Sequence, residues 1–155
     1  MKKIESFQVN HLNLKRGLYV SRRDEQQGVT VTTFDMRVTL PNVEPAMGTA
    51  ALHTVEHLGA TFLRNSQQAQ NVVYFGPMGC RTGFYLVMFG NLNSADVYDL
   101  VRQMCEFILQ FEGEVPGATP VECGNYSDQN LAMAKWYIER YLADLKQYKR
   151  FEYEN

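Results

Sequence analysis

The spacing of apolar residues changes along this chain, and that change constrains the fold more than any other feature of the sequence. Residues 29–40 (VTVTTFDMRVTL) are rich in β-branched residues and alternate in part, which predicts a strand. From Thr49 to Arg64 the apolar residues recur at helical spacing without a proline, which predicts a helix. The chain therefore combines strands with helices.

Two further strands are predicted in the middle of the chain. Residues 71–76 (NVVYFG) and 83–90 (GFYLVMFG) are short, aromatic and β-branched. The loop 77–82 between them contains glycine and proline, so the two segments are expected to pair with each other.

Two further helices are predicted in the second half of the chain. Apolar residues from 97 to 111 recur at helical spacing behind Asn93 and Ser94, which are suitable N-caps. A loop is expected at 113–125, and Ser127 is expected to cap a third helix. The apolar stripe of that helix consists of Leu131, Ala134, Ile138, Tyr141, Leu142 and Leu145.

The order of these segments predicts the fold class. A chain of 155 residues, 45% of them hydrophobic, is long enough for one domain with a substantial core and too short for a second independent one. We expect a single α+β domain spanning residues 1–155, in which helices cover one face of an antiparallel sheet. Trp136, Tyr137 and Tyr141 are expected in the core or in a subunit contact, and the run DLKQYKRFEYEN is expected to be a solvated helix end or a frayed tail.

Charge and cysteine content exclude several classes of protein. The net charge of −2 and the scattered basic residues provide no stripe for a nucleic acid backbone. The N-terminus lacks the apolar region of a signal peptide, and no segment approaches the length of a membrane-spanning helix. Three widely spaced cysteines do not predict a disulfide framework. We therefore expect a cytoplasmic protein with reduced thiols.

The motif HTVEH places His53, Glu56 and His57 within the first predicted helix. Residues three and four positions apart lie on the same helical face, so these side chains project from one patch. Two imidazoles four positions apart can bind one metal ion, and the neighbouring carboxylate is suited to proton transfer. Since two of only three histidines fall in this motif, a metal site is favoured over two unrelated polar histidines.

The third metal ligand is left open by the residues alone, among His11, the cysteines and scattered carboxylates. Cys105 falls on the apolar stripe of the second predicted helix and is expected to pack in the core. Cys123 precedes a glycine in a loop, where a metal-bound thiolate and a buried unligated thiol fit equally well. Cys80, in another loop, fits either a second thiolate ligand or a reactive group.

Five motifs together resemble the S-ribosylhomocysteine lyase (LuxS) family. The family shows an ESF…H start, an FD-x-R strand, an HT-x-EH-L helix, a PMGC-x-TG-[FY]-Y loop and a late CG. Each motif is weak alone, but all five occur here in order from residue 5 to about residue 124. They correspond to Glu5-Ser6-Phe7 with His11, Phe34-Asp35-Met36-Arg37, His53 to Leu58, Pro77 to Tyr85, and Cys123-Gly124.

The resemblance implies a set of site residues. It implies that His53, His57 and Cys123 bind one divalent metal per subunit, Fe(II) or Zn, and that Glu56 and Cys80 are the acid/base pair. It also implies that the substrate is bound by Ser6, His11 and Arg37 around the ribose and by Arg64 near the homocysteine end.

The resemblance also implies a homodimer and a reaction. The two sites are expected at the subunit interface, each built from both chains. The expected reaction cleaves S-ribosylhomocysteine to homocysteine and 4,5-dihydroxy-2,3-pentanedione, the autoinducer-2 precursor of quorum sensing. A metal with an open coordination position would polarise the sugar carbonyl, while Cys80 and Glu56 transfer protons. The use of the product, as a signal or as an outflow of the activated methyl cycle, is left open.

Four positions depart from the common family pattern. Tyr74 replaces an acidic residue, Gly76 a serine, Asn10 an aspartate and Gly59 a leucine. None is a predicted metal ligand or acid/base residue. The first two bear on how the amino-acid end of the substrate is held.

Two other classes also use such a motif. Metallopeptidases of the HxxEH type require a glutamate as third ligand and usually a larger chain. A non-catalytic, metal-stabilised paralogue would close the coordination with four protein ligands, and Cys80 is the candidate for the fourth.

Overall fold

The computed structural model describes residues 2–154, which form one four-stranded antiparallel sheet and three α-helices. The strands are β1 (Gly17–Gln26), β2 (Val29–Arg37), β3 (Val72–Pro77) and β4 (Gly83–Phe89), in the spatial order β1-β2-β4-β3. The helices are α1 (Thr49–Arg64), α2 (Ser94–Gln110) and α3 (Leu131–Tyr148), with short 3₁₀ turns η1 (Glu5–Phe7) and η2 (Ala69–Asn71).

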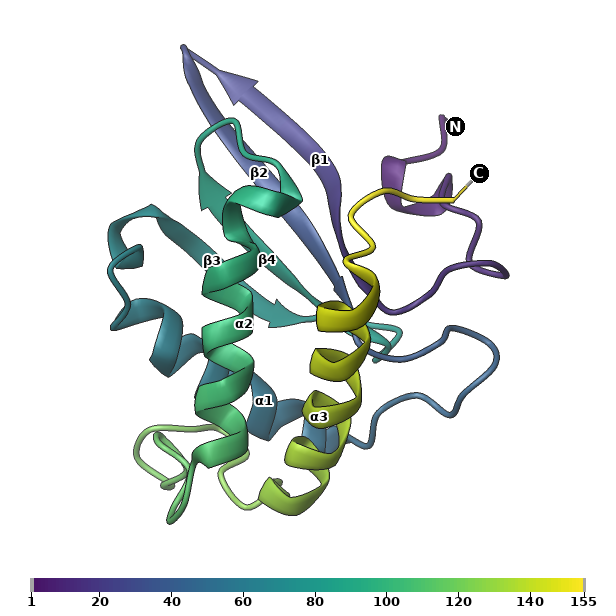
Figure 1. Ribbon diagram of the computed structural model, residues 1–155. Helices are drawn as coiled ribbons and strands as arrows, with labels where there is room; N and C mark the ends of the chain where they lie inside the picture. The colour runs from purple at the N-terminus through teal and green to yellow at the C-terminus, as the bar shows by residue number, and fades with distance from the viewer. Residues whose placement is uncertain (1, 155) are drawn as a thin grey trace.

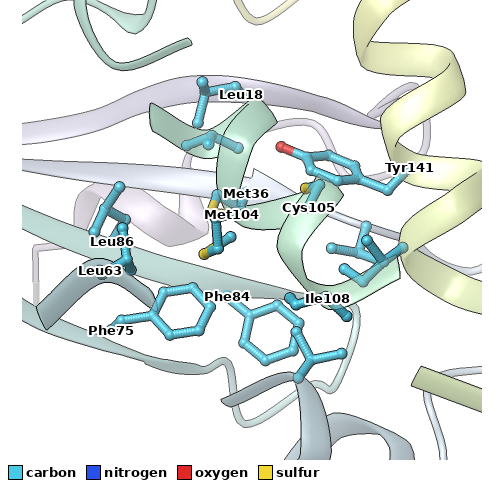
Figure 2. Packing of buried hydrophobic residues seen from close by; sticks show 14 of the residues in the cluster. Leu18, Met36, Leu63, Phe75, Phe84, Leu86, Met104, Cys105, Ile108 and Tyr141 are labelled. Atoms are coloured by element: carbon cyan, nitrogen blue, oxygen red, sulfur yellow. The ribbon is translucent and has the colours of Figure 1, made fainter. Parts of the chain in front are cut away.

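The helices gather on one side of the sheet (Figure 1), which confirms the predicted α+β class. Alternation along β4 explains this arrangement, since Phe84, Leu86 and Met88 are almost fully buried whereas the intervening Tyr85 and Val87 are not. Figure 2 shows Phe84 and Leu86 near Met104 and Ile108 of α2. The opposite face of the sheet carries no α-helix among residues 2–154.

The boundaries of α1 and α2 agree with the predicted ones. Helix α1 spans Thr49–Arg64 as predicted, and α2 begins at Ser94 behind the cap Asn93. The carboxylate of Asp96 accepts a hydrogen bond from the backbone N–H of Asn93 at 2.7 Å, which closes the first turn. Within residues 2–154, no helix has the length and apolar character needed to cross a membrane.

Strand β1 was not predicted from the sequence. Its second half, Arg22–Gln26, is exposed and mostly charged, so it carries no apolar alternation. Pairing with β2 defines the strand instead, through a hairpin whose turn residues Gln27 and Gly28 both have positive φ (52° and 78°).

The predicted cap of α3 is wrong, because the helix begins after Asn130 rather than after Ser127. The Asn130 side chain accepts a hydrogen bond from the backbone N–H of Met133 at 3.0 Å. The residues just before it are held outside the helix by α1: the carbonyl of Asp128 contacts His53, and Gln129 accepts from Thr54.

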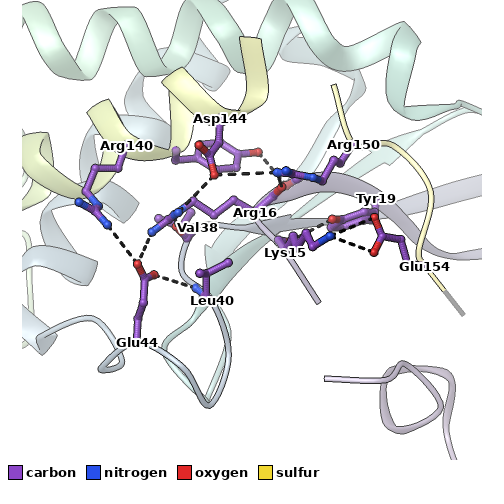
Figure 3. A network of polar contacts seen from close by, with 12 residues as sticks. Lys15, Arg16, Tyr19, Val38, Leu40, Glu44, Arg140, Asp144, Arg150 and Glu154 are labelled. Carbon is purple, nitrogen blue, oxygen red and sulfur yellow. Dashed lines mark hydrogen bonds and ion pairs between the residues drawn. The ribbon is translucent and has the colours of Figure 1, made fainter. Parts of the chain in front are cut away.

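The C-terminal segment beyond α3 is packed, which corrects the expectation of a frayed tail. The Arg150 carbonyl accepts a hydrogen bond from Leu18 at 3.0 Å, and Tyr153 stacks on Tyr19 with ring centroids 4.6 Å apart. Figure 3 shows the ion pairs around Arg16 and the contact between Lys15 and Glu154 that flank this segment. Figure 1 shows the tail running beside the N-terminal segment.

The predicted aromatic cluster on α3 divides into two environments. Tyr141 is completely buried and donates a hydrogen bond to the Gly17 carbonyl at 3.1 Å, as a core position requires. Trp136 is 46% exposed, with the guanidinium of Arg140 4.6 Å from its ring centroid. Trp136 is therefore not a core residue in this chain.

Candidate metal centre and reactive thiol

The structure brings His53, His57 and Cys123 together. The two histidines project from neighbouring turns of α1, and Cys123 comes from the loop 111–130 between α2 and α3. The ligand atoms of the three side chains all lie within 4.8 Å of one another, and each residue is half-buried. Among Cys80, Cys105 and Cys123, it is therefore Cys123 that lies beside the two imidazoles.

Backbone carbonyls fix which nitrogen of each imidazole faces the cluster. His53 Nδ1 lies 3.0 Å from the Asp128 carbonyl, and His57 Nδ1 lies 2.7 Å from the Pro116 carbonyl. A carbonyl oxygen can only accept, so each Nδ1 carries the hydrogen and each Nε2 keeps its lone pair. His53 Nε2 then lies 3.5 Å from Cys123 Sγ. In this tautomer each Nε2 is the nitrogen available to a metal ion.

Gly117 allows the loop to approach His57. Its φ of +73° is unfavourable for any residue with a side chain, and a Cβ there would lie 3.2 Å from His57 Nδ1. The glycine therefore lets the neighbouring Pro116 carbonyl reach the imidazole.

The donor set fits a divalent transition metal. Two neutral imidazole nitrogens and one thiolate suit zinc or ferrous iron. Among residues 2–154, no fourth His, Cys, Asp or Glu joins the group, so a protein-closed site with Cys80 as fourth ligand is not formed within this chain. Three protein ligands leave a coordination position for a small molecule.

Glu56 lies on the same helix as the two histidines and is half-buried. Among residues 2–154, no Lys, Arg or His forms an ion pair with its carboxylate. Its spacing from His53 and His57 puts it on the face of α1 that carries the two imidazoles.

Cys80 lies in the exposed loop between β3 and β4. Its sulfur is 3.2 Å from Thr82 Oγ1 and 3.9 Å from Arg37 Nη1. Partial burial raises the pKa of this thiol, but hydrogen bonds from Thr82 and the positive charge of Arg37 outweigh that effect, so the pKa is lowered overall. The environment favours a thiolate.

Arg37 is buried in an ion pair with Asp35. The guanidinium donates through Nη2 to Asp35 Oδ2 at 2.6 Å and through Nε to Oδ1 at 3.1 Å, and both side chains are 3% exposed. The position of its Nη1 atom, 3.9 Å from Cys80 Sγ, links Arg37 to the thiol.

The other predicted substrate-binding residues are spread over the chain. Ser6 lines a pocket of about 340 Å³ on the open face of the sheet, together with Tyr74 and Tyr85. His11 Nδ1 contacts the Val9 carbonyl at 2.9 Å. Arg64 donates to the carbonyls of residues 72 and 73 on β3 at 3.1 and 3.0 Å. No hydrogen bond within residues 2–154 joins these three side chains to the metal cluster or to Cys80.

Two departures from the family pattern are coupled to each other. The Tyr74 hydroxyl occupies the space that a Cβ at Gly76 would take, so a side chain at position 76 would displace the tyrosine. Gly59 in α1 similarly makes room for the ring of Phe75. Asn10 accepts a hydrogen bond from the Leu12 N–H at 3.1 Å, a turn contact that an aspartate would also make.

Cys105 is completely buried, which confirms the prediction that it packs in the core. Burial raises the pKa of this thiol to about 12, so it is inert at neutral pH. Figure 2 shows it between Met104 and Tyr141.

Sequence reasoning did not assign roles to several residues that shape the two sites. Asp35 and Thr82 fall inside the motifs, yet only the fold shows that they contact Arg37. Pro116 and Asp128 act through backbone carbonyls, which carry no side-chain signal at all. Gly117 could have been noticed only as a glycine in a glycine-rich loop.

An α+β domain with a half-buried His-His-Cys cluster that could hold a metal ion, and a separate thiol of lowered pKa, is the arrangement expected of a metal-dependent enzyme. Comparison with known proteins narrows this class. The S-ribosylhomocysteinase (LuxS) family model matches residues 4–152, and the chain belongs to that family.

Individual relatives agree over nearly their full length. The chain is 55% identical over 150 residues to the S-ribosylhomocysteine lyase of Finegoldia magna, covering 97% of this chain and 96% of the relative. It is 57% identical over 144 residues to the S-ribosylhomocysteine lyase of Clostridium acetobutylicum, covering 92% and 91%. It is 54% identical over 146 residues to that of Phocaeicola vulgatus, covering 94% and 91%. The family predicted from the motifs is confirmed.

Proposed function

We propose that this chain is a carbon–sulfur lyase that cleaves S-ribosylhomocysteine to homocysteine and 4,5-dihydroxy-2,3-pentanedione. The observation that carries the proposal is the convergence of His53, His57 and Cys123 in a member of this family. The activated thiol of Cys80 supplies the second chemical group that the reaction needs.

His53, His57 and Cys123 would hold one divalent ion per subunit, iron or zinc. When bound, the ion supplies positive charge that polarises a sugar carbonyl and stabilises the negative charge that develops on its oxygen. The Asp128 and Pro116 carbonyls keep both imidazoles in the ligand tautomer throughout turnover.

Proton transfers move the carbonyl along the sugar before the thioether bond breaks. Two tautomerisations shift the carbonyl from C1 to C2 and then to C3, and each takes a proton from one carbon and returns it to the neighbouring carbon. Cys80 as thiolate and Glu56 as carboxylate are the proton acceptors and, once protonated, the donors. Glu56 then removes the proton at C4, and homocysteine leaves from C5 by β-elimination.

The substrate contacts are assigned by family position. Ser6, His11 and Arg37 would bind the ribose hydroxyls, and Arg64 would lie near the homocysteine end. Arg64 donates to the carbonyl of Val73, which precedes Tyr74 in β3, and this supports the proposal that the departure at position 74 bears on the same end of the substrate.

We propose that the chain is a cytoplasmic homodimer with two sites at its interface, each built from both chains. The open face of the sheet supports a partner there, and so do the exposed apolar side chains Phe7 (70%) and Leu12 (77%) in the N-terminal segment. Three free cysteines suit a reducing compartment. The product would serve as autoinducer-2 precursor or leave the activated methyl cycle.

Release of free thiol tests the reaction. The metal-loaded protein given S-ribosylhomocysteine should release homocysteine, detected with a thiol reagent, and Glu56→Gln should lower the rate by about 10²–10⁴-fold. Normal turnover by Glu56→Gln would show that the base is another residue. Peptide hydrolysis without thiol release would support the metallopeptidase alternative, although the cluster here contains Cys123 where that class uses a glutamate.

Mixing two inactive variants tests the shared site. If each site takes Cys80 from one chain and Glu56 from the other, a mixed dimer of Cys80→Ala and Glu56→Gln contains one intact site. Statistical mixing should then restore about a quarter of the wild-type activity. Absence of any recovery in verified mixed dimers would place both residues of a site in one chain.

A further inference from the structure

A continuous series of polar contacts connects the C-terminal tail to the Cys80 sulfur. Tyr153 donates to Asp35 Oδ2 at 3.1 Å, and Asp35 is paired with Arg37. Arg37 Nη1 donates to Thr82 Oγ1 at 2.6 Å, and that oxygen lies 3.2 Å from Cys80 Sγ. We call these five side chains the tail-to-thiol chain.

The chemistry of the groups assigns the donors and acceptors of the tail-to-thiol chain from Tyr153 as far as Thr82. A carboxylate only accepts, so Tyr153 and Arg37 both donate to Asp35. A guanidinium only donates, so Thr82 Oγ1 accepts from Arg37 and keeps its single hydrogen for another partner. When Cys80 is a thiolate its sulfur can only accept, so Thr82 then donates to it across the 3.2 Å contact. The arrangement is satisfied by a thiolate at its end.

We propose that Thr82 and Tyr153 are positioning residues, which hold Arg37 and the Cys80 sulfur in the arrangement that a reactive thiolate requires. Thr82 acts directly on the sulfur, whereas Tyr153 acts through Asp35 and Arg37. The importance of Thr82 and Tyr153 for catalysis rests on the proposed function of Cys80. Their effect on the pKa of the Cys80 thiol does not depend on that function.

Both Thr82 and Tyr153 make further contacts that hold them in place in the tail-to-thiol chain. Thr82 directly precedes β4. Its carbonyl accepts hydrogen bonds from the N–H groups of residues 38 and 39, which follow the end of β2, both at 3.0 Å. Tyr153 is held by stacking on Tyr19. The C-terminal tail is thus a structural part of the thiol site, although it lies 73 positions (153 − 80) away in sequence.

The ionisable groups near Cys80 are one cation, the carboxylate paired with it and two tyrosines. They are Arg37 and Asp35 from β2, Tyr85 from β4 and Tyr153 from the tail. Burial and then the charge of Asp35 raise the pKa of both tyrosines, so they stay neutral at physiological pH. Burial of the sulfur opposes the thiolate, whereas hydrogen bonds of Thr82 and the cation of Arg37 favour it.

Alkylation of Cys80 by iodoacetamide as a function of pH tests the role of Thr82. The metal-loaded full chain is used, and the rate for Cys80→Ala is subtracted to remove any contribution of Cys105 and Cys123. Thr82→Val should shift the pH profile upward and slow alkylation at neutral pH by about tenfold or more, the size of one hydrogen bond to a charged group. Thr82→Ser retains the hydroxyl and should keep the wild-type profile.

Two results would overturn the proposal for Thr82. One is a wild-type profile in Thr82→Val, and the other is the same upward shift in Thr82→Ser. Thermal unfolding of both variants accompanies the measurement, because a merely structural role would lower the unfolding temperature without moving the pH profile. The readout uses no substrate, so it can succeed or fail independently of the lyase reaction.

Tyr153→Phe tests the end of the tail-to-thiol chain that is farthest from Cys80. It removes the hydroxyl and keeps the ring that stacks on Tyr19, so the profile should move in the same direction as in Thr82→Val but by a smaller amount. Tyr148→Phe is the matched control, since this tyrosine is 50% exposed on the last turn of α3. Equal profiles for Tyr153→Phe and Tyr148→Phe would remove the tail from the proposal.

Discussion

The two reactive parts of this molecule are held in opposite ways. The imidazoles of the metal cluster are oriented by backbone carbonyls of the loop 111–130, which contains no helix or strand and no fully buried residue. Cys80 is oriented by side chains, through a buried ion pair on a central strand of the sheet. The orientation of the two imidazoles therefore depends on the position of the loop 111–130. The orientation of Cys80 depends on the buried guanidinium of Arg37.

Because of this difference, metal binding and the pKa of the Cys80 thiol should respond independently to mutations. A bound ion would tie the loop to α1 and stabilise it, because three ligands from two segments are joined at one point. The contacts of Arg37 and Thr82 with Cys80 involve no metal ligand. Changes to the metal cluster should therefore leave the thiol unaffected, and changes around Arg37 should leave metal binding intact.

The largest expected effect comes from Asp35→Asn. This nearly isosteric change leaves the buried charge of Arg37 without its partner and should destabilise the fold by about 3–5 kcal/mol in urea unfolding. Metal content should stay at the wild-type level. Asp99→Asn is the matched control, because Asp99 forms an exposed pair with Arg102 on α2, and it should cost about 0–1 kcal/mol. Similar values for both variants would contradict the buried role of the Asp35–Arg37 pair.

Metal removal should have the next largest effect. A chelator removes the stabilisation of the folded state, about 2.7 kcal/mol when the free metal was at 100 times its dissociation constant. The unfolding temperature should fall, and limited proteolysis should cut within 111–130. The pH profile of Cys80 alkylation should not change. A shift of that profile on chelation would show that the two parts are coupled within the folded protein.

Gly117→Ala should weaken metal binding by about 10–100-fold, the usual loss when a contact that orients a ligand is disturbed. The added Cβ meets the imidazole of His57, as described above. Gly113→Ala is the control: Gly113 also has positive φ, +99°, but a Cβ there meets no atom within 4 Å. Both variants strain the backbone, so only the difference in metal affinity reports on His57. Equal affinities would mean that the loop tolerates displacement at this point.

The smallest effect concerns stability as a function of pH. Because the folded-state pKa of Cys80 lies below its ordinary value of 9.0, the unfolded chain binds more protons between the two values. The free energy of unfolding should therefore rise with pH across that window relative to Cys80→Ala. This contribution is complete above the ordinary thiol pKa and is lost as the pH falls through the folded-state value. Parallel stability curves for the two proteins would indicate an unperturbed thiol.

The same contrast explains how much could be predicted from the sequence. Helix α1 and its three-residue motif were predicted correctly, because periodicity and ligand spacing are local properties. Strand β1 was missed because its outer half is stabilised by pairing and has no apolar pattern of its own. The start of α3 was misplaced because contacts with His53 and Thr54, about 75 positions away, hold residues 128 and 129 outside the helix.

The thiol site was the less predictable of the two. Cys80 could be recognised as a candidate only by its loop position and its motif. Its activation depends on Tyr153 and Asp35, which are 118 positions apart, and a tail of mixed charge and aromatics gives no local sign that it packs against a strand. Contacts between distant segments decide that chemistry.

Metal content and homocysteine release, measured together on the metal-loaded Cys80→Ala protein, test the central claim most directly. The claim that the thiol is a separate catalytic group predicts a wild-type amount of bound metal and a rate of thiol release lower by about 10²–10⁴-fold. Loss of the metal would instead make Cys80 a structural ligand, and undiminished release would mean that the thiol takes no part in the reaction.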